Sequence, residues 1–213
     1  LHYKQKEVLN NLVRIGHLEL PEVTPILGSK KEYFYRNKME FSFSDSRWLT
    51  LDEIRSEEEI DNKSALGFHI PGMWDKILDI KKCHLQADPS NAIRLDTKKF
   101  ATKNGLSFFN PRHQKGQLRT LMIRTSSIGE VMVLIQFFED DQTKRTLLLD
   151  HLAATFPEIT SLLYVINQKQ NDTLYDQEIN CHSGRDHIFE EMEGLQFKIT
   201  AKSFYQTNSD QAY

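Results

Sequence analysis

The sequence lacks the glycine-rich loops that hold nucleotide cofactors. No GxGxxG run follows a predicted strand, and no GxxxxGK[ST] run occurs anywhere in the 213 residues. The chain therefore shows no nucleotide-cofactor pocket of its own.

Cysteine is scarce, and its placement excludes two kinds of cross-link. Cys83 and Cys181 lie far apart, which argues against a disulfide framework and for a reducing compartment. Each is followed by a histidine, but neither pair has the CxxC spacing of a zinc site. We expect a cytoplasmic protein with no zinc and no disulfide, in which Cys181 is structural.

Long apolar runs and a large net charge are also missing. No run reaches the roughly 18 apolar residues that a membrane span needs, and nothing resembles a signal peptide. The net charge of -3 gives no general attraction to nucleic acid, so any such binding would depend on local basic patches. The eight histidines are scattered, and we predict no catalytic residue in this chain.

Hydrophobic periodicity predicts a mixture of helices and strands. Helices are expected at 1–16, 89–105 and 141–156, and strands at 35–43, 65–70, 77–83, 118–125, 131–138 and 161–167. The stretch 167–208 is also expected to be rich in strands, with a turn around Gly184. The acidic stretch 52–61 has little periodicity and is expected to be a solvated loop or hairpin tip. Because helices and strands do not alternate regularly, we predict an α+β fold with a largely antiparallel sheet and flanking helices.

The final extended run carries an aromatic ring among cations. If residues 195–206 form a regular strand, Phe204 shares a polar face with Lys198 and Lys202. An exposed ring beside cations suits base stacking with phosphate neutralisation. A bend near Ser203 would instead place Phe204 in the core, which the pattern alone favours.

Other basic residues leave the same choice open. Arg36 and Lys38 lie on the outer edge of the strand at 35–43, where Asn37 interrupts the apolar row. They are either phosphate contacts or ordinary solvated charges. The same alternatives apply to Arg112, Lys115, Arg119 and Arg124.

Four segments carry a family resemblance. In order and spacing, GFHIPG, ILDIKKCHLQ, GQLRTLMIR and FKITAKSFYQTNSDQAY resemble the bacterial RNA (uracil-5-)-methyltransferases of the RumA/TrmA type, and within them the 23S ribosomal RNA branch. The resemblance covers nearly the whole chain, and SFYQTNSDQAY is its most specific part. It implies a central α+β RNA-binding domain at 1–206 and, at 207–213, the truncated start of a Rossmann-like domain that binds S-adenosylmethionine.

This resemblance also implies a division of labour. In the family, a cysteine thiolate adds to C6 of uracil, C5 takes the methyl group, and a base removes the C5 proton. None of these groups has a counterpart here, so we expect this chain to position RNA for 5-methyluridine formation and to be inactive alone. The extruded uridine costs a few kcal/mol, roughly, which RNA contacts elsewhere must offset.

Three residues match functional positions of the family. Gln206 matches the glutamine of its F-x-Q-x-N motif, which contacts S-adenosylmethionine, and Phe204 matches a position close to the target RNA bases. Cys83 matches the fourth ligand of a [4Fe-4S] cluster, whose other three ligands would precede Leu1. One cysteine alone cannot hold a cluster.

Two other functions compete with this interpretation. The chain could be a nonenzymatic RNA-binding module that uses Arg36, Lys38, Lys198 and Lys202, or a structural spacer that only positions its neighbours. RNA is the expected partner of both the methyltransferase and the RNA-binding module. No obligate protein partner is evident. A glycine-rich cofactor motif in the complete protein would favour the enzyme.

Overall fold

A computed structural model describes residues 1–56, 60 and 62–212 and divides the chain into two compact units, Leu1–Glu32 and Tyr33–Tyr213. The first unit contains the predicted N-terminal helix, as α1 (His2–Asn10) continued by a π-helical turn, η1 (Asn11–Ile15). Within this unit the side chain of Gln5 donates to the carbonyl oxygen of Thr24 and accepts from the amide of Ile26, which ties the following segment back to α1.

The second unit is built on a seven-stranded sheet in the order β3-β2-β1-β4-β5-β6-β7. Every neighbouring pair is antiparallel except β5 and β6, which are parallel. The predicted fold class, mixed with a mostly antiparallel sheet, is therefore confirmed. The strands are β1 (Lys38–Ser44), β2 (Ala65–Ile70), β3 (Met73–Leu78), β4 (Leu118–Thr125), β5 (Val131–Phe137), β6 (Ile159–Ile166) and β7 (Asn180–Gly184).

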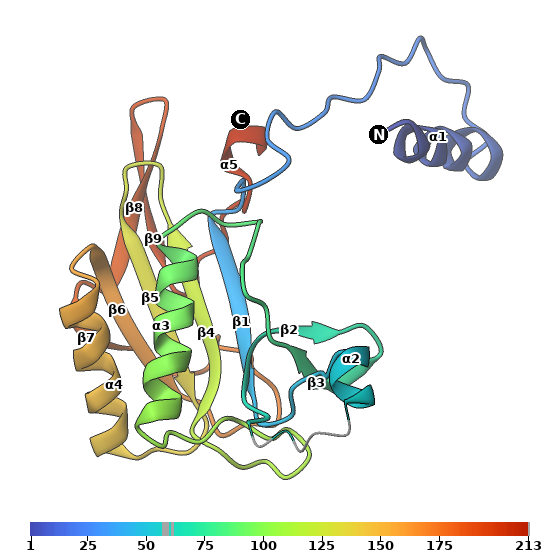
Figure 1. Cartoon of the computed structure of the whole chain (residues 1–213). Helices are drawn as coiled ribbons and strands as arrows, with labels where there is room; N and C mark the ends of the chain where they lie inside the picture. Colours follow the sequence, from blue (N-terminus) through green and yellow to red (C-terminus); the bar gives the residue numbers. More distant parts are fainter. Residues whose placement is uncertain (57–59, 61, 213) are drawn as a thin grey trace. The chain divides into compact units, whose positions relative to one another are not determined.

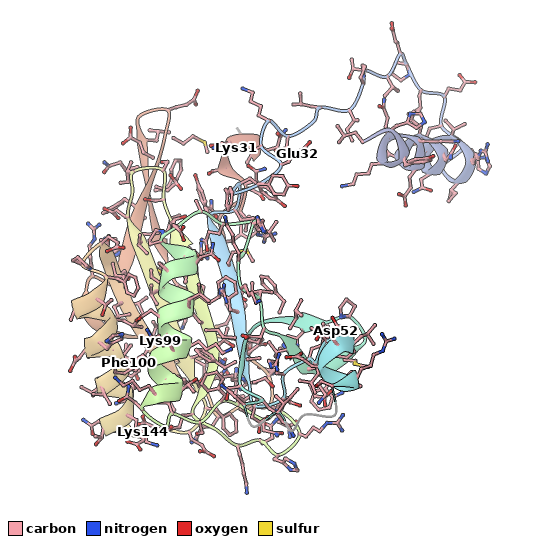
Figure 2. All side chains as sticks on the ribbon, viewed as in Figure 1. Lys31, Glu32, Asp52, Lys99, Phe100 and Lys144 are labelled. Carbon is pink, nitrogen blue, oxygen red and sulfur yellow. The ribbon has the colours of Figure 1, made fainter. Side chains whose placement is uncertain are left out.

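Two long helices cover one face of this sheet. α3 (Ser90–Lys103) and α4 (Gln142–Thr155) lie on the same side of it in Figure 1, and α4 is the crossover between the parallel strands β5 and β6. Phe100 of α3 stacks on His151 of α4, and Lys144 donates to the carbonyl oxygen of Gly105 just after α3; Figure 2 labels Phe100 and Lys144. The main core, with Phe41, lies between these helices and the sheet.

The opposite face of the sheet is only partly covered. A separate hairpin, β8 (His187–Met192) and β9 (Leu195–Thr200), packs Ile188 and Ile199 against Met132 and Leu163. The rest of this face is left for the segments that follow β6 and β9. The cavities described below form there.

Three predicted elements differ from the structure. Part of the acidic stretch forms a short helix, α2 (Leu51–Arg55), because Thr50 and Glu53 make a capping box; residues 57–59 and 61 of that stretch lie outside the described residues. The strand expected at 77–83 is shifted to β3 and ends at Leu78. β9 ends at Thr200, so the run to Gln206 is not one strand.

A short helix, α5 (Ser209–Ala212), lies within the segment 207–213 and was not among the helices expected from periodicity. No helix within the described part of the chain is both long and apolar enough to cross a membrane.

Candidate functional site

A cavity of about 370 Å³ lies on the face of the sheet opposite α3 and α4. Its floor comes from alternate residues of β1, β4 and β5, whose side chains point to one side of the pleat. Its walls are residues 172–175, 201–205 and 207. The floor residues are Lys38, Glu40, Thr120, Met122, Arg124, Leu134 and Gln136.

The strand register sets the character of this floor. Met122 pairs with both Glu40 and Leu134 across neighbouring strands and forms an apolar middle. Arg124, paired with Lys38, lies at one end, and Gln136, paired with Thr120, lies at the other. An apolar strip between polar ends suits a flat ligand with polar edges.

The wall segment 203–207 carries two of the residues matched from the family. A turn at Ala201 and Lys202 follows β9, and Ser203 Oγ accepts from the amide of Thr200 at 2.9 Å. Residues 195–206 therefore do not form the regular strand that would place Phe204 on one polar face with Lys198 and Lys202. Phe204 is nevertheless 86% exposed, so the alternative that places its ring in the core is also wrong.

Two side chains hold this segment in place, Arg124 of β4 and Asn37 just before β1. Arg124 Nη2 donates to the carbonyl oxygen of Ser203 at 2.6 Å, and Asn37 Nδ2 donates to that of Gln206 at 2.8 Å. The amide of Asn37 also donates to the carbonyl oxygen of Thr207 at 2.8 Å. Phe204 is thus presented on a loop that is fixed at both ends.

Both anchors were missed from the sequence. Arg124 is only 4% exposed, so it is not the solvated charge considered as one alternative; burial lowers the pKa of its guanidinium, and the charge of Glu40 opposes that shift. Arg119 is similarly buried and donates to the carbonyl oxygens of Asn167, Lys169 and Gln170. The sequence signal for this role was the presence of two arginines, Arg119 and Arg124, within a strand rich in apolar residues.

The predicted basic residues are not all brought together. Lys38 and Lys202 line the cavity with Phe204, whereas Arg36 and Lys198 do not. The ammonium of Lys202 donates to the carbonyl oxygens of Tyr175 at 3.1 Å and Gln177 at 2.6 Å, so it holds a wall segment.

The other three predicted basic residues differ in the ion pairs and hydrogen bonds that they make. Lys38 pairs with Glu40 at 2.5 Å inside the cavity. Lys198 is half exposed, with Asp186 3.9 Å away, and Arg36 donates to the carbonyl oxygen of Lys38 at 3.4 Å. Of the predicted phosphate contacts, Lys198 therefore has the weakest interaction within the protein.

A second cavity of about 220 Å³ adjoins the first, with Thr120 and Asp172 in both linings. Its rim carries the exposed ring of Trp74, with the Arg112 guanidinium 5.5 Å from the ring centroid. A hydrogen bond from Arg112 holds the pKa of Asp75 below its ordinary value. The exposed face of the sheet is thus hollowed along β1 and β4.

Cys83 has no partners for a metal among the residues that the structure describes. It is 2% exposed in the main core, and its backbone is held by the side chain of Asn91 at 2.7 and 3.1 Å. Within the described ranges, no group of three or more potential ligands could hold a metal ion. A lone buried thiol does not fit an iron-sulfur cluster, and the structure gives that expectation no support.

The cavity's chemistry is that of binding. Its lining holds an amide, hydroxyls, carboxylates and cations around apolar side chains, and among the described residues it includes no cysteine or histidine. Gln206, the predicted cofactor contact, is exposed and lies outside the cavity lining, although its backbone is anchored by Asn37. The site can recognise a ligand and present Phe204 beside it.

Comparison with known proteins identifies similar chains. An uncharacterized RNA methyltransferase of Bacteroides thetaiotaomicron is 56% identical to this chain over 216 residues. Another, from Porphyromonas gingivalis, is 52% identical over 221 residues. Both matches cover 100% of this chain, but 48% and 47% of the relatives' own lengths, so the chain spans about half the length of the curated relatives it matches. No family model matches the sequence.

A solved structure shares the fold. The Pyrococcus abyssi tRNA (uracil-54, C5)-methyltransferase, in complex with S-adenosyl-L-homocysteine, superposes with a TM-score of 0.68 at 26% identity. The match covers 99% of this chain and 46% of that one. The chain is therefore similar in sequence to proteins named RNA methyltransferases and in fold to part of a uracil-C5 methyltransferase.

Proposed function

We propose that this chain is the central, RNA-holding part of a cytoplasmic S-adenosylmethionine-dependent RNA (uracil-5-)-methyltransferase. The observation that carries the proposal is the exposed ring of Phe204, held beside a cavity by the anchors Arg124 and Asn37. A large apolar ring held in solvent contributes little to the stability of the fold, because it is not buried. The same ring is well placed to stack on a base. The names of the relatives and of the solved neighbour support the same class of reaction.

The proposal divides the chain into two parts. Residues 1–206 hold RNA through Phe204, with Arg36, Lys38 and Lys198 near its phosphates and Lys202 holding the cavity wall. Residues 207–213 begin the domain that binds S-adenosylmethionine, and Gln206 contacts that cofactor from the junction. Methyl transfer is assigned to the part of the relatives' length that this chain does not match. The proposal includes no iron-sulfur cluster.

The proposed RNA is 23S ribosomal RNA, with 5-methyluridine as product. The solved neighbour acts on a tRNA, which makes tRNA the competing substrate. The complete encoded protein, incubated with labelled S-adenosylmethionine and either RNA, would decide between them. Methylation of tRNA but not of 23S RNA would overturn the substrate while leaving the reaction class intact.

Three variants of the complete encoded protein test the two contacts. Phe204→Ala should weaken RNA binding by about 1 to 3 kcal/mol through a lost base stack, and Phe204→Trp should retain binding because it keeps a ring. Gln206→Ala should weaken S-adenosylhomocysteine by about 1 to 3 kcal/mol if a buried polar partner is left unpaired. Fluorescence anisotropy and calorimetry measure the two dissociation constants.

The pattern of losses separates the competing functions. If Phe204→Ala weakens RNA while the wild-type protein binds no S-adenosylhomocysteine, the chain belongs to a nonenzymatic RNA-binding module. If Phe204→Ala changes neither RNA affinity nor cofactor affinity, the stacking role is wrong.

A further inference from the structure

The floor of the 370 Å³ cavity contains a buried amide without a partner. Gln136 of β5 is 2% exposed, and no described group accepts a hydrogen bond from its Nε2. A buried donor left unpaired destabilises the folded protein, so it usually indicates a bound water or ligand. At the opposite end of the floor, Nε of Arg124 is also buried and has no hydrogen-bond partner in the described part of the chain.

These two donors lie too far apart for one small ring to reach both. Gln136 faces Thr120 on β4, and Arg124 lies four residues further along that strand, roughly 13 Å away at the rise of a strand. Between them lie Met122 and Leu134, which offer an apolar surface to the face of a ring. A volume of 370 Å³ is at the small end of the range for ligand sites, about 300 to 1,000 Å³.

The lining carries three cations, Lys38, Arg124 and Lys202, and two carboxylates, Glu40 and Asp172. Glu40 offsets the ammonium of Lys38 at 2.5 Å, and Asp172 adds a second carboxylate to the walls. Carboxylates accept from amino or imino groups, and Arg124 and Lys202 already donate to backbone carbonyl oxygens. The ligand is therefore expected to carry both donors and acceptors around a flat ring.

We infer that this cavity receives one unstacked base of the bound RNA, with Gln136 donating to a carbonyl oxygen or ring nitrogen on its edge. Met122 and Leu134 lie against the face of the base. The ring of Phe204, exposed at the same cavity, stacks on a neighbouring base and guides the strand across the opening. This inference rests on the proposed RNA-binding function, and it makes Gln136 a residue that determines which RNA sequence is bound.

The test uses the complete encoded protein and a set of RNA hairpins in which each unpaired nucleotide in turn lacks its base. For the wild-type protein, one position should stand out, where base removal weakens binding about tenfold or more. Gln136→Met, which keeps the length but removes the amide, should weaken binding of the intact RNA about ten- to a hundredfold and abolish the penalty at that position. Gln136→Glu, which replaces a donor with an acceptor, should change the base preferred there.

A thermal melt shows whether Gln136→Met acts through folding. Because the amide has no partner among the described residues, its loss should leave the melting temperature unchanged or raised. A lowered melting temperature with equal losses for every RNA would show a structural role and overturn the inference.

The other outcomes separate this inference from the proposed function. If the wild-type protein binds no RNA, the proposed function fails first. If Phe204→Ala weakens RNA but Gln136→Met leaves both affinity and the base-removal pattern unchanged, the base pocket alone is wrong. If free uridine or adenosine occupies the cavity as tightly as the RNA, the site is one for a small molecule.

Discussion

Arg124 and Ser203 meet across 79 residues of sequence, with the guanidinium 2.6 Å from the carbonyl oxygen. This contact holds the segment that follows β9 against β4, which forms part of the cavity floor. Because a guanidinium in a largely buried site makes a strong hydrogen bond to a carbonyl, the contact keeps the adjacent Phe204 loop from moving freely. The position of an exposed ring is thus set by a buried cation.

Loss of this contact should loosen the loop locally. In Arg124→Met, the carbonyl oxygen of Thr207 should separate more often from the amide of Asn37, which donates to it at 2.8 Å. We expect exchange of the Asn37 amide to accelerate about tenfold, because one hydrogen bond to a charged group contributes about 1.5 to 3 kcal/mol. Two-dimensional NMR after transfer to D2O measures it, with the Ile123 amide of β4 and the exposed-site variant Arg55→Met as controls.

Asn37 should act on RNA only through Phe204. Asn37→Ala removes the side-chain bond to Gln206 without touching the cavity lining, so it should weaken RNA binding modestly, by about 0.5 to 1.5 kcal/mol. In a Phe204→Ala background the same change should have almost no effect, since there is no longer a ring to position. Additive losses in this double-mutant cycle would show that Asn37 contacts RNA by another route.

Local pattern predicted the elements that pack on the helical face. β4, β5, α3 and α4 have strong periodicity, and their boundaries agree closely with the prediction. The end of β9 could not be predicted in this way, because the turn at Ala201 depends on the contact between Thr200 and Ser203 and on Arg124. Alternation alone extends a strand until a breaking residue appears, and none does here.

The candidate site was predicted less well for a related reason. Exposure of Phe204 was one of two open alternatives, and the resemblance to a family, not the pattern, selected it. Arg119 and Arg124 were treated as candidates for solvated charge because their partners are backbone carbonyl oxygens, which carry no sequence signal. Gln136 was not singled out, since an amide in an apolar strand becomes informative only when its lack of a partner is known.

The stability of the short helix α2 should fall at low pH. Hydrogen bonds from Arg47, and then from the Thr50 backbone, lower the pKa of Glu53 from 4.5 to about 2. Because the folded-state pKa is depressed, the stabilisation is complete above pH 4.5 and is lost as the pH falls through about 2. An NMR titration of the Glu53 carboxyl carbon should show this midpoint, and Arg47→Gln should move it upward. A wild-type midpoint near 4.5 would contradict the capping box.

The two lysines predicted as phosphate contacts should behave differently. Lys198 is half exposed and its distance of 3.9 Å to Asp186 makes a weak ion pair, so it is available to a phosphate. Lys198→Ala should reduce the slope of log affinity against log salt by about 0.7, the value for one contact to a single strand. Lys202 instead donates to Tyr175 and Gln177. Lys202→Ala should therefore leave that slope nearly unchanged while exposing the wall segment to faster proteolysis.

Salt titrations of both variants with one RNA, followed by anisotropy between about 50 and 200 mM salt, make the comparison direct. Lys198→Gln, which removes the charge but keeps a long polar side chain, is the matched control and should reproduce the reduced slope of Lys198→Ala. An equal fall in slope for Lys198→Ala and Lys202→Ala would mean that the Lys202 ammonium leaves the wall to bind phosphate. The wall contacts would then belong to the RNA-free state alone.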